Sequence, residues 1–203
     1  MENAQSVAAR IAETIRKLPQ SKRQLIAMAG PPAAGKSTIS KALVAELGDS
    51  AALVPLDGFH FSNDILDARD LRARKGAPES FDLAGFSALL ERLRTEAEVA
   101  VPTFNRALDV SIGSSVLVKK HHNLIIVEGN YLLLDEPGWR DLKTQWDLSV
   151  ALNVPEEVLE QRLIQRWLDH GLSAKDARTR AMSNDIPNAR RVARNQTAAD
   201  LRI

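Results

Sequence analysis

The chain has 203 residues, which is enough for one well-filled α/β core, with room for a lid but hardly for a second core. Its 27 Lys and Arg residues against 26 Asp and Glu residues give a formal charge of +1, so net charge indicates neither nucleic acid nor an anionic membrane as partner. The absence of cysteine excludes disulfides, thiolate metal sites and thiol catalysis. No apolar run approaches the roughly 18 to 20 residues of a membrane span. We therefore expect a single-domain cytoplasmic protein, with a homodimer left open.

The N-terminal part predicts a helix followed by a buried strand. Val7, Ile11 and Ile15 recur at helical spacing, and Pro19 stops the pattern. Residues 25–29 are apolar throughout, which is typical of a parallel strand that helices cover on both faces.

A phosphate-binding loop follows this strand. Residues 30–38 read Gly-Pro-Pro-Ala-Ala-Gly-Lys-Ser-Thr and match G-x-x-x-x-G-K-[ST], and a helical pattern from residue 39 to 47 follows them. We expect the two glycines to let backbone N–H groups turn around an anion, at which the next helix points its N-terminus. Lys36 would reach the β- and γ-phosphates of a nucleotide, and Ser37 would bind Mg²⁺. The predicted nucleotide-binding residues of the loop are Gly30, Pro31, Ala33, Ala34, Gly35, Lys36, Ser37 and Thr38. The alternative is an ordinary turn before a helix, in which Lys36 is solvated.

Two further strands end at carboxylates. A strand over residues 51–56 leads to Asp57-Gly58, and a strand over 124–127 leads to Glu128. Ligands of open parallel sheets bind beyond the carboxyl ends of the strands, so both side chains should lie near the phosphates. We predict Asp57 as catalytic base, with Gly58 allowing the substrate to approach, and Glu128 as a ligand of Mg²⁺. For either residue a helix cap or an ion-pair partner is the alternative role, and for His60 substrate contact and packing remain equally open.

The middle of the chain predicts a small antiparallel flap. Strands over residues 99–104 and 115–118 flank a turn at Gly113. Before them we expect a short helix and loop over residues 63–74, a turn at 74–79, and a helix after Asp82.

The C-terminal part predicts a lid. A core strand over residues 148–154 precedes a helix from residue 156 to about 170 and another from 174 to about 184. Arg162 and Arg166 are four residues apart, so they share one helix face. We expect a lid over about residues 156–185 that brings both arginines to the phosphates, where they would act in catalysis. A solvated basic face is the alternative, whereas a nucleic-acid surface would need more aromatic residues than this region has.

With these residues assembled, the chain resembles the P-loop kinases that include uridine kinase, phosphoribulokinase and the bacterial-type pantothenate kinase. It is most similar to proteins described as sugar (fructose transport system) or nucleoside kinases. Five segments carry the resemblance: residues 30–38, 55–60, 74–82, 101–106 and 126–133. It implies a three-layer α/β/α fold with a mainly parallel sheet, a helical lid and the small flap.

The resemblance also implies a role for individual residues. Asp57 would be the base, Arg162 and Arg166 would lie on the lid, and Asn188 would lie close to the adenine of ATP. Where the family pattern has aspartate after Phe104, this chain has Asn105, which cannot accept a proton. The predicted substrate-binding residues are Asp57, His60, Arg74, Lys75, Asp82, Asn105, Arg106, Asn130 and Tyr131.

The leading hypothesis is an ATP- and Mg²⁺-dependent kinase that phosphorylates a hydroxyl of a small metabolite, foremost a sugar such as fructose. A nucleoside or pantothenate-type kinase is the alternative within this class. A different class of function is a regulatory ATPase switch that has no small-molecule acceptor. A nucleotide-binding adaptor without chemistry is a third hypothesis, but it would leave Asp57 unexplained.

Overall fold

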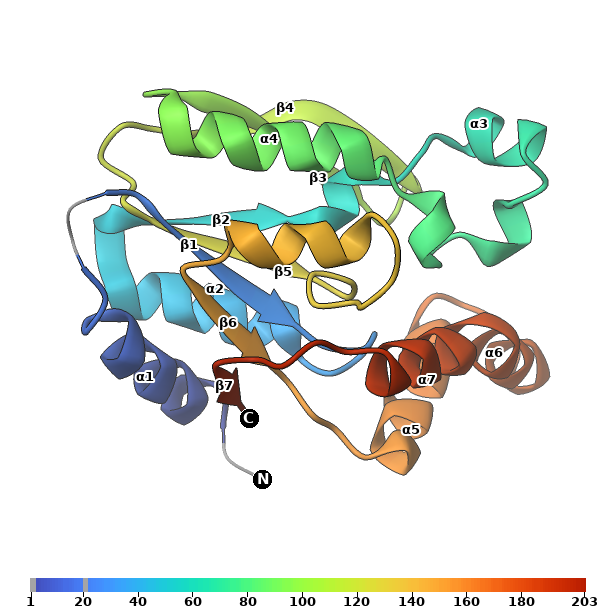
Figure 1. The fold of residues 1–203 in the computed structure, drawn as a ribbon. Helices are drawn as coiled ribbons and strands as arrows, with labels where there is room; N and C mark the ends of the chain where they lie inside the picture. The colour runs from blue at the N-terminus through green and yellow to red at the C-terminus, as the bar shows by residue number, and fades with distance from the viewer. Residues whose placement is uncertain (1–2, 20–21) are drawn as a thin grey trace.

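A central sheet of five parallel strands organises the structure, a computed structural model that describes residues 3–19 and 22–203. The strands lie in the order β2-β5-β1-β6-β7 (Figure 1). Their bounds are β1 (Gln24–Ala29), β2 (Ala51–Pro55), β5 (Leu124–Gly129), β6 (Leu148–Ala151) and β7 (Leu201–Arg202). The four strands predicted for this sheet are confirmed, and β7, too short to predict from a pattern, adds a parallel edge strand.

Strand β1 lies in the middle of the sheet because it is apolar on both faces. All six of its residues are buried. Leu25 and Ala27 belong to the core on one face of the sheet, whereas Ile26 and Met28 belong to the core on the other. This alternation gives the three layers of the fold.

Helices α1 (Ala4–Ile15) and α2 (Lys36–Leu47) cover one face, and α4 (Leu83–Thr95) lies on the other (Figure 1). Ile11 of α1 and Leu43 of α2 are fully buried beneath the sheet, as their helical spacing predicts. The predicted three-layer α/β/α architecture is thereby confirmed.

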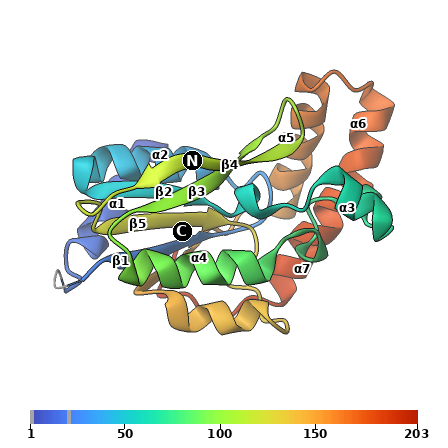
Figure 2. The same ribbon diagram turned by 90° about the horizontal axis from the view of Figure 1, so that it is seen from above.

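The flap is a two-stranded antiparallel sheet of β3 (Val99–Asn105) and β4 (Val110–Val118). The predicted turn at Gly113 is wrong: β4 runs through this residue, and the chain turns at residues 106–109 instead. Asp109 supports that turn with a φ of 54°. Figure 2 shows the turn reaching toward α5 (Glu156–Asp169).

The C-terminal helices are α5, α6 (Ala174–Arg180) and α7 (Ile186–Arg194); α5 and α6 lie within the part that we predicted as a lid, and α7 follows it (Figure 1). The predicted helix end near residue 184 needs correction, because a π-helical turn, Ala181–Asp185, joins α6 to α7. Opposite these helices, α3 (Asn63–Ala68) confirms the short helix expected after residue 63. The 3₁₀ segment Trp139–Gln145 lies before β6 in the chain.

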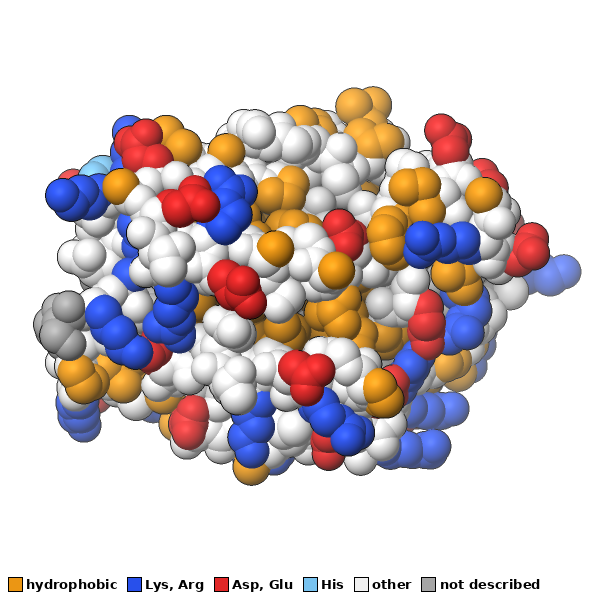
Figure 3. All heavy atoms as spheres, turned by 45° about the horizontal axis from the view of Figure 1, so that its top comes forward, with side chains coloured by type: hydrophobic (Ala, Val, Ile, Leu, Met, Phe, Trp, Pro, Cys, Tyr) orange, Lys and Arg blue, Asp and Glu red, His pale blue; other side chains and the backbone are white. Residues whose placement is uncertain are grey.

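Acidic and basic side chains are interspersed on the molecular face seen in Figure 3. Among the described residues, no helix combines the length and the apolar character that crossing a membrane requires.

Candidate functional site

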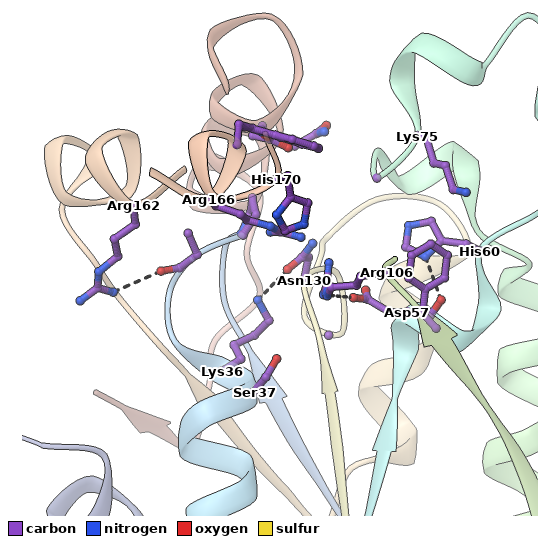
Figure 4. Close-up of a pocket in the computed structure, with 18 of the residues that line it drawn as sticks. Lys36, Ser37, Asp57, His60, Lys75, Arg106, Asn130, Arg162, Arg166 and His170 are labelled. Carbon is purple, nitrogen blue, oxygen red and sulfur yellow. Dashed lines mark hydrogen bonds and ion pairs between the residues drawn. The ribbon is translucent and has the colours of Figure 1, made fainter. Parts of the chain in front are cut away.

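A cavity of about 710 Å³ lies at the carboxyl ends of β1, β2 and β5. The phosphate loop and Lys36 form one end, and Asp57, Lys75 and the turn of the flap form the other (Figure 4). The cavity therefore joins the predicted nucleotide and acceptor sites in one space, which is where an open parallel sheet is expected to bind its ligands.

The phosphate loop has two residues with left-handed backbone. Gly35 has a φ of 96°, as the motif predicts, but the other is Ala33 with a φ of 62°. Gly30 does not have a positive φ, so the conformational reason we gave for it is wrong. A Cβ at Gly30 would lie 3.1 Å from both the Cβ and the carbonyl oxygen of Leu152, so close packing against the end of β6 explains this glycine.

Lys36 starts α2 and is buried, with 7 % of its surface exposed. Its Nζ donates to the carbonyl of Pro31 at 2.9 Å and to Oδ1 of Asn130 at 2.6 Å. Burial lowers the pKa of the Lys36 ammonium, while the negative charges of Glu128 and Asp57 oppose that shift. Asn130, predicted to contact the acceptor, instead orients this lysine at the phosphate end of the cavity.

The side-chain oxygens of Ser37 and Glu128 lie next to each other, close to Lys36. The Ser37 hydroxyl donates to Oε1 of Glu128 at 2.9 Å. Burial raises the pKa of the Glu128 carboxyl, and the adjacent Lys36 opposes the shift. A hydroxyl and a carboxylate at this position are the hard oxygen donors that Mg²⁺ prefers, so the residues present fit this ion.

Asp57 lies in the 3₁₀ turn Leu56–Phe59 directly after β2. Its Oδ2 accepts from the Arg106 guanidinium of the flap at 2.6 Å (Figure 4). A Cβ at Gly58 would lie 2.4 Å from the Pro102 carbonyl oxygen. We therefore correct the role given to this glycine: it lets the flap, and not the substrate, approach the turn that carries Asp57.

His60 closes the acceptor end. Its Nδ1 lies 2.8 Å from the Asp57 carbonyl oxygen, to which it can only donate, and its ring stacks against Phe81 and Phe104. Burial lowers the pKa of His60, and the charges of Lys75 and Arg106 add to this, whereas Asp57 opposes it.

We expect acid to destabilise the folded protein through His60. The unfolded chain binds the His60 proton near pH 6.5, and the folded protein binds it only at lower pH, so the free energy of unfolding falls as the pH drops below about 6.5. Urea unfolding between pH 5 and 8 should show a smaller pH slope for His60→Gln than for the wild type. The control is His170→Gln, at an exposed histidine, and an unchanged slope in His60→Gln would contradict the expectation.

Lys75 is the second cation of the acceptor end. Its Nζ donates to Oδ1 of Asn63 at 2.7 Å and pairs with Oδ1 of Asp109 at 2.9 Å. It also lies 5.0 Å from the centre of the Phe104 ring. Asp109 lines the cavity but was not predicted, because it follows a loop whose course the sequence pattern does not reveal.

Four predicted acceptor residues do not line the cavity. Arg74 lies at the surface beside Glu79, and Asp82 caps α4 by accepting from the Gly85 N–H at 2.9 Å. Asn105 accepts from the Leu108 N–H at 3.1 Å, which braces the turn of the flap. Tyr131 is buried in the core, and its hydroxyl donates to the Gly76 carbonyl. Their predicted contact with an acceptor is therefore corrected: Asp82, Asn105 and Tyr131 support neighbouring structure, and Arg74 lies at the surface.

The lid side presents arginines to the same cavity. Arg162 donates to the Ala33 carbonyl at 3.2 Å, and Arg166 lies deeper, where burial lowers the pKa of its guanidinium and the nearby charge of Arg106 lowers it further. Asn188 of α7 also lines the cavity. His170 and Asp185 join them, as do two lid residues that we had not assigned to the site, Trp167 and Arg180.

Most predicted site residues meet in this one cavity. Those that line it are Ala33, Gly35, Lys36, Ser37, Thr38, Asp57, His60, Lys75, Arg106, Glu128, Asn130, Arg162, Arg166 and Asn188. Gly30, Pro31 and Ala34 belong to the phosphate loop but lie behind its inner surface. Arg180 ends the helix that Ser173 caps, and no motif in the sequence marks it as a site residue.

Comparison with known proteins agrees with this geometry. The family model described as "AAA domain" matches residues 26–178. Escherichia coli YggC, an uncharacterized protein, is 32 % identical over 99 % of this chain and 86 % of its own. The Schizosaccharomyces pombe protein named "Putative uridine kinase C227.14" is 34 % identical over 91 % of this chain and 84 % of its own.

A solved structure shares the whole fold. It comes from Silicibacter sp. TM1040 and is described as a "putative fructose transport system kinase"; the two chains cover each other completely, with 44 % identity and a TM-score of 0.90. The chain therefore belongs to the AAA domain family and, within it, to the P-loop kinases that use ATP to phosphorylate small molecules.

Proposed function

We propose that this kinase transfers the γ-phosphoryl group of ATP to a hydroxyl of a neutral polyhydroxy metabolite, a sugar such as fructose. The observation that carries the proposal is the shared cavity, in which Asp57 faces the phosphate loop. In-line transfer requires the acceptor hydroxyl and the γ-phosphate to meet in one space, and this cavity joins the two ends.

The charges at the acceptor end favour a neutral acceptor. Asp57 is paired with Arg106 at 2.6 Å, and Asp109 is paired with Lys75 at 2.9 Å. At this end a carboxylate or phosphate on the acceptor would compete with Asp57 for Arg106 or with Asp109 for Lys75, whereas sugar hydroxyls can both donate to carboxylates and accept from cations. The paired charges therefore suit a polyol better than an acid such as pantothenate.

A nucleoside is the second candidate, because a relative is named as a uridine kinase. A base would need an aromatic face on which to stack. Phe104 is the aromatic ring at this end, but it already contacts His60 and Lys75, which leaves it less available. The site therefore suits a sugar better than a nucleoside.

Transfer would proceed as follows. The acceptor oxygen forms a bond to the γ-phosphorus while the bond from that phosphorus to the β–γ bridging oxygen breaks, and ADP leaves. Oδ1 of Asp57 takes the hydroxyl proton, since Oδ2 is held by Arg106. Lys36 holds the β- and γ-phosphates, and Arg166 faces the charge that develops between donor and acceptor.

Mg²⁺ would be held by Ser37 and Glu128. When bound, it neutralises charge on the phosphates of the nucleotide.

The test is an ADP-release assay with Mg-ATP and a panel of acceptors. We expect release to depend on fructose or a related neutral sugar or polyol, with the phosphorylated product identified by mass spectrometry. Uridine, cytidine, pantothenate and D-glycerate serve as the competing acceptors. Strict dependence on one of these would contradict the neutral-polyol assignment, and release that ignores every acceptor but responds to a protein would favour a regulatory switch.

A further inference from the structure

The acceptor end of the cavity depends on one loop, residues 72–80, which we call the acceptor loop. It contributes Arg72, Lys75 and Gly76 to the lining. The loop contains only short 3₁₀ segments, and Gly76 has a φ of 100°. Hydrogen bonds within the loop hold part of this shape, such as that from the Gly76 N–H to Ser80 Oγ at 2.9 Å, and the rest depends on contacts from elsewhere in the chain.

Side chains of the C-terminal helices hold it. Arg180 donates to the carbonyls of Ala73 at 2.9 Å and Lys75 at 3.3 Å. The Asn184 amide donates to the same Lys75 carbonyl at 3.0 Å. Asn184 is 5 % exposed, so this hydrogen bond is shielded from water. The backbone of the residue that places a cation in the acceptor site is thus fixed from a part of the chain more than a hundred residues away.

A proline explains why Asn184 reaches the loop. Pro187 lacks an N–H and would crowd the carbonyl four residues before it in a regular α-helix. The helix widens instead: the Ile186 N–H donates to the Ala181 carbonyl, five residues back. Such π-turns redirect side chains and are frequent at functional sites.

The same segment also faces the rest of the cavity. Asp185 lines it and accepts from the Trp167 indole at 2.6 Å. Asn188 lines it too, and its amide donates to Oδ1 of Asn184 at 3.4 Å. A chain of contacts thus runs from Asn188 through Asn184 to the Lys75 carbonyl.

We propose that Asn184 and Arg180 are positioning residues that couple nucleotide binding to the placement of the acceptor loop. This inference rests on the proposed function and on the expectation, drawn from the family resemblance, that the adenine of ATP lies close to Asn188. A nucleotide that orders α6, the π-turn and α7 then orders the acceptor loop through these hydrogen bonds. Because coupling is reciprocal, a bound acceptor tightens nucleotide binding by the same factor.

Hydrogen exchange on the full chain, with and without the non-hydrolysable analogue AMP-PNP and Mg²⁺, tests the coupling without knowledge of the acceptor. In the wild type, the analogue should slow exchange of the amides in residues 72–80 by about fivefold or more. Asn184→Ala and Asn184→Asp should lose most of this slowing, while exchange in β1 stays as in the wild type. The aspartate is isosteric and still accepts from Asn188, but it cannot donate to the Lys75 carbonyl.

The matched controls are Ser183→Ala, next to Asn184, and Arg178→Ala, on α6 two residues before Arg180. Both side chains are exposed, and Arg178 pairs with Glu160 at 2.9 Å away from the acceptor loop. Both variants should keep the full effect of the analogue. With an acceptor found in the panel, Asn184→Asp should raise KM for the acceptor about fivefold at saturating ATP and KM for ATP by a similar factor at saturating acceptor, while the affinity for AMP-PNP alone stays nearly unchanged.

Full slowing in Asn184→Asp, or binding of AMP-PNP to the wild type without slowing, would overturn the coupling alone. If the wild type does not bind the analogue at all, the proposed function fails, and the inference fails with it.

Discussion

Replacing Asp57 with asparagine should lower kcat about 10³-fold, within the usual range for loss of a general base. The amide keeps the size of the side chain but cannot accept the proton of the acceptor hydroxyl. Nucleotide affinity should change less than about tenfold, or 1.4 kcal/mol, because Asp57 lies at the acceptor end of the cavity. Acceptor-dependent ADP release measures kcat, and titration calorimetry with AMP-PNP measures affinity.

The matched control for this variant is Asp135→Asn. Asp135 also pairs with an arginine, Arg140, at 3.2 Å, but its side chain is 55 % exposed and lies outside the cavity lining. Both substitutions break an ion pair with an exposed arginine, so each should cost below about 1 kcal/mol of folding stability. Only Asp57→Asn should lose turnover. Near-wild-type kcat in Asp57→Asn would remove this carboxylate from the mechanism.

The phosphate end of the site is predictable from sequence because its chemistry is local. One strand, a nine-residue loop and one helix N-terminus are contiguous, so the motif at residues 30–38 defines the phosphate cradle by itself. The carboxylates at the ends of β2 and β5 follow from topology, because parallel neighbours of β1 bring their carboxyl ends to the same edge.

The acceptor end is less predictable because it is assembled from distant segments. The turn of the flap was misplaced, since Gly113 has the composition of a turn but lies within a strand. We predicted both Asn105 and Tyr131 to contact the acceptor, yet Asn105 braces the turn of the flap and Tyr131 fills the core. A motif shows that a residue matters to the site, but only packing shows whether it touches the ligand.

The glycines show the same limit. Gly30 and Gly58 could be assigned to the site from their neighbours in sequence, but the physical reason for each is a close approach of distant backbone, at Leu152 and at Pro102. The structural effect of Pro187 is equally hard to predict from the sequence. It suggests a helix end, whereas a π-turn lets the helix continue and directs Asn184 at the acceptor loop.

Removing the guanidinium of Arg166 should also lower kcat strongly, by about 10³-fold in Arg166→Ala. Arg166 lines the cavity, where burial lowers the pKa of its guanidinium and the negative charges of Asp185 and Asp57 oppose this shift. Within the described part of the chain, no carboxylate forms an ion pair with it, and its guanidinium carbon lies 5.9 Å from the centre of the Trp167 ring. A cation desolvated in this way is placed to stabilise charge on the transferring phosphoryl group, where the surrounding low dielectric strengthens the attraction.

Three variants separate this role from a general effect of charge or of the lid. Arg166→Lys keeps the charge but not the planar fork, so it should recover only part of kcat. Arg162→Ala should lose less than Arg166→Ala, because Arg162 donates to the Ala33 carbonyl and thereby supports the phosphate loop. Arg178→Ala, at an exposed lid arginine, should leave kcat unchanged. If Arg162→Ala proved the more damaging change, the two arginines would exchange roles, and Arg166 would be the one that supports the lid.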